Sequence, residues 1–237
     1  MNKWWVALFG TLFGVMVAGS NSRSKGPGDL LARVDHLVYG TPNLDDGIEQ
    51  LAKLLGVRAT PGGQHPGRGT RNALISLGPA SYLEIIGPDP DQPNPQEPRP
   101  FGIDHIEAPR LVAWSAKGTD LEHLVSESRR LVVNLGEVLS GSRRRPDGVD
   151  LSWRFTDPRT VLADGIVPFF IDWGKTSHPA STAVKGVTLI SLKAEHPDAE
   201  RIQKVLGALG LDLPVQPGPA PALIATINSS RGRVELR

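Results

Sequence analysis

The chain has 237 residues, 39% of them hydrophobic, and a formal net charge of +1 at pH 7. This composition is that of a globular protein with one large domain or two small ones, and the balanced charge gives no reason to expect nucleic acid as a partner. The sequence contains no cysteine, which excludes disulfides, thiolate metal sites and cysteine nucleophiles.

The N-terminal residues 1–19 are apolar. After Lys3 they form an uncharged run of roughly 16 residues, which is short for a membrane-spanning helix of about 20. We predict a signal peptide cleaved near residues 18–20, or an uncleaved membrane anchor, so the expected protein is secreted or membrane-anchored. A helix packed on the domain is the alternative reading of this run. Residues 20–31 are expected to form a linker.

A strand over residues 34–39 opens the first predicted unit. A helix follows, starting at Thr41 and Pro42, which suit a cap and the first helical position, and ending at Gly56. Three more strands are predicted over residues 57–65, 70–77 and 81–86. The proline-rich residues 88–100 then break regular structure and are expected to link two modules.

The same order of elements restarts twice, with helices roughly 75 to 80 residues apart, which indicates an internal repeat. The first restart has a strand over 111–115, a helix opened by the capping box at 119–122, and strands over 136–139, 149–155 and 167–173. The second has a strand over 187–192, a helix over 197–209, and strands over 223–227 and 233–236. We therefore predict an α+β fold of tandem βαβββ units, with curved mixed sheets around a cavity and helices outside.

His36 and Glu84 are the leading candidates for a functional site. Side chains alternate between the faces of a strand, so the two converge if their strands share a sheet with these faces aligned. Imidazole nitrogen and carboxylate oxygen suit Mn²⁺, Fe²⁺, Ni²⁺ or Zn²⁺, but a site needs at least three protein ligands or a mixture with water. The alternatives are a hydrogen-bonded pair in a metal-free pocket, or two side chains that do not meet.

Several other polar and aromatic side chains each have more than one possible role. His65 lies in a glycine-rich loop and is a third ligand, a general base or a surface histidine. Asn72 either contacts the substrate or makes hydrogen bonds that satisfy polar groups at the end of a strand. Trp114, Trp153 and Trp173 build either the core or the wall of a substrate pocket. His178 reaches the cavity mouth or has no role.

Arginine is concentrated in the run Arg143, Arg144 and Arg145. This run is predicted to be a solvated hairpin tip, with contact to a phosphate or a membrane surface as the alternative.

Four segments occur in a fixed order along the chain: Asp35-His36-Leu37-Val38, residues 62–74 from Gly62-Gly63 to Leu74, Tyr82-Leu83-Glu84-Ile85-Ile86-Gly87-Pro88-Asp89, and Pro168-Phe169-Phe170-Ile171-Asp172-Trp173 with His178-Pro179. Together they resemble the glyoxalase-like domain family of the vicinal oxygen chelate superfamily. The resemblance covers about residues 34–180. We therefore expect a glyoxalase-like domain at 32–180, with units 34–88 and 110–174, and the second restart of the repeat adds a third, shorter extension at 181–237.

The resemblance also implies a ligand set. The superfamily takes a ligand from the first strand and a glutamate from the fourth strand of each of two units, and His36 and Glu84 match these positions in the first unit. The second unit has Ala113 at the first position, and Ile171 or Asp172 at the second. Asp172 could complete the set if the register is shifted by one residue, and Glu235 could complete it if the third unit closes the cavity.

We therefore expect a metal-dependent enzyme of the vicinal oxygen chelate type, an isomerase, lyase or dioxygenase, acting on a small oxygenated molecule. Glu84 or His65 would move a proton, and Asn72, Trp114, Asp172, Trp173 and His178 would contact the substrate. The alternative is a metal-free protein that binds a small molecule in the same cavity. A homodimer, formed if the third unit pairs with a second chain, is a further expectation.

Overall fold

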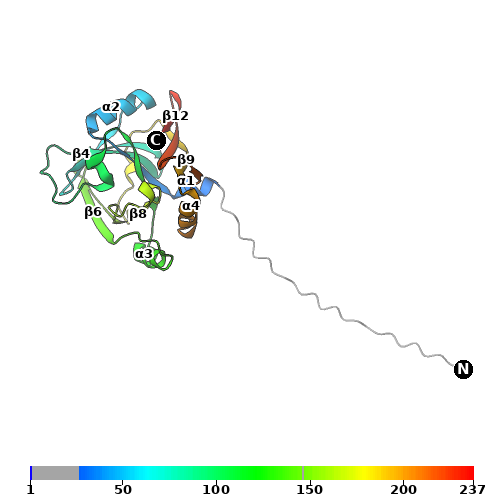
Figure 1. The fold of residues 1–237 in the computed structure, drawn as a ribbon. Coiled ribbons are helices and arrows are strands. Elements are labelled where there is room, and N and C mark those ends of the chain that lie inside the picture. The colour runs from blue at the N-terminus through cyan, green and yellow to red at the C-terminus, as the bar shows by residue number, and fades with distance from the viewer. Residues whose placement is uncertain (2–26, 146) are drawn as a thin grey trace.

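The computed structural model describes residue 1 and residues 27–145 and 147–237 (Figure 1). Apart from Met1, the predicted signal peptide or anchor therefore lies outside the described residues. Helix α1 (Pro27–Arg33) begins within the segment expected to be a linker, and its Leu30 is buried in the main core. Across the part of the chain that is described, no helix is long and apolar enough to cross a membrane.

The first unit follows the predicted order. Its helix begins after the cap residue Asn43, whose side chain accepts hydrogen bonds from the N–H groups of Asp45 and Asp46. The expected cap, Thr41, instead donates its hydroxyl to the carbonyl of Asn43. Gly56 ends the helix in the left-handed conformation, as predicted. The elements are β1 (Val34–Gly40), α2 (Leu44–Leu55), β2 (Thr60–His65), β3 (Thr70–Gly78) and β4 (Ser81–Pro88).

The second unit repeats this order, and three short 3-10 helices lie in the connections around it. One strand, β6, runs on to Arg144 and is longer than predicted, because Arg144 pairs with Asp150 on the neighbouring strand. The elements are η1 (Pro100–His105), β5 (Arg110–Lys117), α3 (Leu121–Arg130), β6 (Val138–Arg144), β7 (Asp150–Thr156), η2 (Ala163–Gly165), β8 (Phe169–Asp172) and η3 (Pro179–Ser181).

The two units share one eight-stranded mixed sheet in the order β2-β3-β4-β1-β5-β8-β7-β6. In each unit the fourth strand pairs in parallel with the first, and the units join where β1 runs antiparallel to β5. Helix α2 packs against β3 and β4, and α3 packs against β6, β7 and β8. The outer strands β2 and β6 contact each other, so the sheet nearly closes on itself. The predicted α+β fold with a curved mixed sheet is confirmed.

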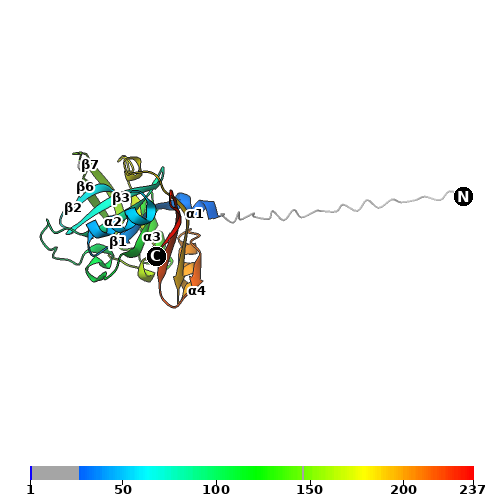
Figure 2. The same ribbon diagram turned by 90° about the horizontal axis from the view of Figure 1, so that it is seen from above.

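The C-terminal elements form a second sheet with a different strand order. It has four strands, β10-β9-β11-β12, so its first strand pairs with the second and third strands rather than the fourth. Its apolar residues belong to the same main core as those of the large sheet, and it lies beside α1 (Figure 2). The elements are β9 (Thr188–His196), α4 (Ala199–Ala208), β10 (Val215–Pro217), β11 (Ala222–Ser229) and β12 (Gly232–Leu236).

Candidate active site

A pocket of about 230 Å³ lies between the first and second units. This volume is below the usual 300–1,000 Å³ of ligand pockets, so the pocket suits a small molecule. Its chemistry is mixed, because polar and charged groups share the lining with six aromatic rings. The polar and charged groups include His36, His65, Arg68, Asn72, Glu84 and Arg143, and the aromatic rings are Tyr82, Phe101, Trp153, Phe155, Phe169 and Trp173.

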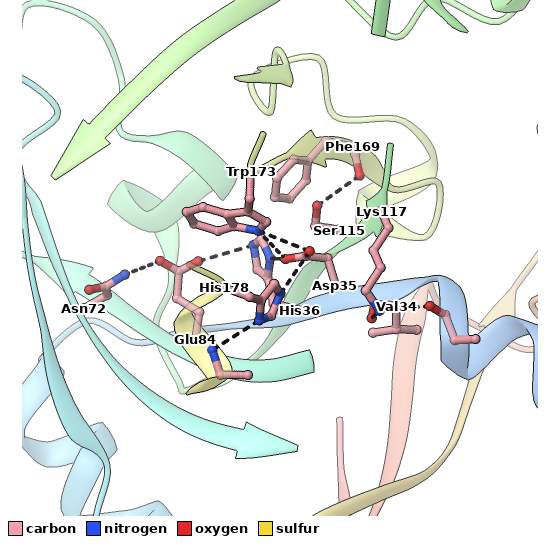
Figure 3. Close-up of polar contacts among 12 residues, drawn as sticks. Val34, Asp35, His36, Asn72, Glu84, Ser115, Lys117, Phe169, Trp173 and His178 are labelled. Atoms are coloured by element: carbon pink, nitrogen blue, oxygen red, sulfur yellow. Dashed lines mark hydrogen bonds and ion pairs between the residues drawn. The ribbon is translucent and has the colours of Figure 1, made fainter. Parts of the chain in front are cut away.

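Asp35 and His36 are adjacent on β1, and their side chains nevertheless contact each other. Strict alternation would place them on opposite faces, but the pairing of β1 with β5 shifts register between Val34 and His36. Such a bulge re-aims side chains. The Nδ1–H of His36 donates to Oδ1 of Asp35 at 2.8 Å, and both residues are buried (Figure 3). The bulge therefore creates a carboxylate–histidine pair that the alternation rule does not predict.

Asp35 accepts hydrogen bonds from two further donors in the segment that follows β8. Trp173 Nε1 lies 3.2 Å from Oδ2, and His178 Nε2 lies 3.2 Å from the same oxygen. Because Nδ1 of His178 accepts from the N–H of Ala180, its proton lies on Nε2 and points at Asp35. Burial raises the pKa of Asp35, but the hydrogen bonds of His178 and His36 outweigh it and hold that pKa well below its usual range. Asp35 is therefore a buried anion with three donors.

His36 is held between this anion and the pocket. Its ring stacks on Tyr82, with centroids 4.6 Å apart, and meets the edge of Phe169 at 5.4 Å. Because Nδ1 donates the hydrogen bond to Asp35, Nε2 is the ring nitrogen that is left to accept a proton. This nitrogen lies 3.7 Å from Oε2 of Glu84. Two proton acceptors thus face each other at the pocket wall.

Glu84 and His65 are joined through Asn72. The amide nitrogen of Asn72 donates to Oε1 of Glu84 at 2.5 Å and lies 3.3 Å from Nε2 of His65. His65 therefore accepts at Nε2 and donates from Nδ1 to the hydroxyl of Thr70 at 3.0 Å. Burial lowers the pKa of His65 to about 4, against the opposing charge of Glu84, so the ring is neutral at pH 7. This network fixes one oxygen of Glu84 and leaves the other free.

Of the sequence-predicted site residues, the structure brings together His36, His65, Asn72, Glu84, Trp173 and His178. Trp173 lines the pocket and also binds Asp35, and His178 lies behind the pocket as a partner of Asp35 rather than at its mouth.

Three predicted residues lie elsewhere. Trp114 is fully buried in the main core and donates its Nε1–H to the carbonyl of Ile166 at 2.7 Å, so it does not contact the pocket. Asp172 does not line the pocket, and its carboxylate accepts from the N–H of Gly174. Glu235 lies in the second sheet, where it pairs with Arg237. Neither carboxylate completes a ligand set with His36 and Glu84.

Sequence reasoning missed Asp35 and the two pocket arginines, Arg68 and Arg143. An acidic residue within an otherwise apolar strand was the available signal for Asp35. Arg143 was assigned to an exposed tip, but it is 5% exposed, and its guanidinium donates to the carbonyl of Gly62 on β2. The contact occurs because β6 reaches β2, where the sheet closes.

The donors suit a divalent metal only in part. His36 Nε2 and Glu84 Oε2 are free and of the right chemical type, and Asp35 orients His36 as a carboxylate orients a metal-bound histidine. His65 is not free, because its Nε2 accepts from Asn72. Within the described residues, no group of three His, Cys, Asp or Glu side chains could hold a metal ion. His36 and Glu84 therefore provide two protein ligands, whereas catalytic zinc sites usually have three.

Comparisons with known proteins agree with this architecture. A family model described as "Glyoxalase-like domain" matches residues 34–210, which extends past α4 and beyond the predicted range of resemblance. No curated protein matches the sequence.

Among solved structures, a hypothetical protein from Staphylococcus aureus shares the fold. It is 13% identical, has a TM-score of 0.58, and the match covers 84% of this chain and 92% of that one. Methylmalonyl-CoA epimerase from Mycobacterium tuberculosis matches at 19% identity and a TM-score of 0.41, over 61% of this chain and 90% of its own. A Streptomyces coelicolor methylmalonyl-CoA epimerase matches at 17% identity and a TM-score of 0.41. This match covers 62% of this chain and 98% of the epimerase chain.

Proposed function

The chain belongs to the glyoxalase-like domain family, and from this premise we propose that it is an enzyme that moves a proton on a small oxygenated molecule. The reaction class is an isomerase or a lyase acting next to a carbonyl group. The single observation that carries the proposal is the facing pair of His36 Nε2 and Glu84 Oε2, 3.7 Å apart at the wall of the pocket.

His36 has the features of a general base. Its free Nε2 accepts a proton from a carbon next to the carbonyl, and the electron pair moves to the carbonyl oxygen to form an enolate. Asp35 remains ionised behind the ring and stabilises the imidazolium, as the aspartate does in other carboxylate–histidine pairs. Return of the proton to the neighbouring atom gives an isomer, and expulsion of a leaving group from the enolate gives a lyase product.

Glu84 supplies the second acceptor. Asn72 holds Oε1, so the free Oε2 is available to take or return a proton on the hydroxyl of an α-hydroxy carbonyl substrate. The negative charge of the enolate develops in a pocket that also contains the guanidinium groups of Arg68 and Arg143, which stabilise it.

A divalent metal, as expected for the superfamily, would be held by His36 and Glu84 and would polarise two neighbouring substrate oxygens. Because the described residues supply two free donors rather than three, the proton transfer above is assigned to the side chains themselves. Of the three expected reaction classes, dioxygenase chemistry fits this site least well. It relies on a redox metal held by three protein ligands, and the described residues supply two free donors.

The test is solvent exchange. The protein is incubated in D₂O with a panel of α-hydroxy carbonyl compounds, and loss of the carbon-bound proton is followed by NMR. Exchange is expected for the wild type and to fall by about 10²- to 10⁴-fold in His36→Asn and Glu84→Gln. Asp172→Asn is the matched control, because that carboxylate lies outside the pocket. Equal exchange in all four proteins would refute the assignment.

A metal-free binding protein is the second candidate. It is favoured by the second unit, which lines the pocket with four aromatic rings and contributes no acidic or imidazole group among the described residues. Tight binding of a ligand that neither exchanges protons nor changes chemically would favour this function over the enzyme. The four rings are Trp153, Phe155, Phe169 and Trp173.

A further inference from the structure

Arg143 is a buried cation with no carboxylate partner among the residues that the structure describes. Its neighbours in the sequence, Arg144 and Arg145, each pair with an aspartate, Asp150 and Asp147 respectively. No carboxylate among the described residues lies within 4.0 Å of Arg143, and its guanidinium contacts the carbonyl of Gly62. The three arginines are therefore not equivalent, and only Arg143 is directed into the pocket wall.

Burying a guanidinium without an anion costs free energy. Burial lowers the pKa of Arg143, although the negative charge of Glu84 opposes this, which reflects the unfavourable desolvation of its cation. A group held at this cost is suited to a bound anion, because guanidinium matches carboxylate and phosphate oxygens in charge and geometry.

Arg68 places a second guanidinium in the same pocket. It lies over the ring of Phe155, with its central carbon 5.0 Å from the ring centroid, and no described carboxylate is within 4.0 Å of it. Arg68 comes from the glycine-rich loop between β2 and β3, whereas Arg143 comes from β6. The pocket therefore contains two cationic groups against the single carboxylate of Glu84.

Next to these cations the wall is aromatic and apolar. Trp153 lies 5.2 Å from Trp173 and 6.3 Å from Phe155 between ring centroids. Gly141 makes room for the wall, since a Cβ at this position would lie 2.5 Å from the indole of Trp153. A planar, apolar ligand body would pack on these rings.

We propose that the pocket binds a small anion with a flat, apolar body, and that Arg143 pairs with the carboxylate or phosphate group of that anion. This inference rests on the proposed function, because it concerns the substrate of the same pocket. It assigns Arg143 as the residue that selects charged over neutral molecules, with Arg68 supporting it.

The experiment measures binding of three related probes by isothermal titration calorimetry. Mandelate carries a carboxylate, phenyl phosphate carries a phosphate, and methyl mandelate is the neutral match of mandelate. We expect one or both anions to bind the wild type roughly 10- to 100-fold more tightly than methyl mandelate, the range of a charge-assisted hydrogen bond. The two anions show which of the two groups the site prefers.

Arg143→Gln should remove this preference, while Arg144→Gln, its neighbour on the strand, should retain it. The proposal is overturned if the wild type binds the anions and the ester equally, or binds none of the three. These two outcomes are measured on the wild type, so misfolding of a variant cannot cause them. A preference that survives Arg143→Gln would also overturn it. If Arg143-dependent binding is found but no proton exchange occurs in D₂O, the proposed reaction fails and the anion site stands.

Discussion

Asp35→Asn is expected to destabilise the protein more than any other isosteric change at the pocket. The Asp35 carboxylate is 1% exposed and accepts from His36, Trp173 and His178. Asparagine keeps one acceptor oxygen but replaces the other with an NH₂ group. That group faces a donor from one of the partner side chains, so at least one hydrogen bond is lost and two donors oppose each other.

The size of the effect follows from the charge and the burial. A hydrogen bond to a charged group contributes about 1.5–3 kcal/mol, and removing one partner of a buried charged group costs about 3–5 kcal/mol. Since asparagine retains one acceptor, we expect a loss of about 3 kcal/mol in the free energy of unfolding. For a chain of this size that corresponds to a fall in Tm of roughly 6–12 °C.

The measurement is urea unfolding followed by far-UV circular dichroism, with Asp172→Asn as the control. Asp172 is the same residue type, is more exposed, and accepts from the N–H of Gly174 at a strand end. Its variant should unfold within about 1 kcal/mol of the wild type. If Asp35→Asn and Asp172→Asn unfold at the same urea concentration, the three-donor account of Asp35 is wrong.

Three further changes test other contacts. Gly62→Ala would place a Cβ 2.1 Å from Oδ1 of Asn72, so it should displace that amide from Glu84 and lower the exchange rate in D₂O about tenfold or more. Gly207→Ala, on an open helix surface, is the control and should leave the exchange rate unchanged. Trp114→Phe should cost about 2–4 kcal/mol in urea unfolding, because it removes the hydrogen bond to Ile166 and leaves a cavity, and an unchanged midpoint would contradict this. Mass spectrometry of protein purified without chelator or nickel should find less than one divalent metal per chain; stoichiometric metal that is lost in His36→Ala and Glu84→Ala would instead show that these two side chains hold a metal together with water or a further ligand.

The repeat and the meeting of His36 with Glu84 follow from local rules. Alternation places each residue on a defined face, and β1 and β4 are parallel neighbours in which Val38 pairs with Glu84, one step along the face from His36. The spacing of the helices identifies the first two units as repeats of one another, so the two halves of the large sheet could be predicted without knowing any contact. The third unit shares their order of elements but not their strand pairing, which no local pattern specifies.

The remaining site features depend on long-range pairing. Asp35 turns toward His36 because of a bulge against β5, about 80 residues away in the chain, and alternation alone puts the two side chains on opposite faces. Trp114 and Trp153 look alike in sequence, but one packs into the core and the other lines the pocket. Arg143 becomes buried only because the sheet closes between β6 and β2. Each of these outcomes is decided by a partner strand and not by the residue's own neighbours.

The same βαβββ backbone carries different chemistry in its two copies. The first unit supplies the acid–base groups, His36, Glu84 and the Asn72 network, whereas the second supplies Arg143 and most of the aromatic wall. A site divided in this way can hold one end of a molecule by charge and ring stacking while proton transfer takes place at the other. Substitutions in the second unit or at Arg68 should therefore change which molecules bind, and substitutions at His36, Glu84 or Asn72 should change what happens to them. This separation follows from placing the two units face to face around one pocket, since each unit contributes its own wall.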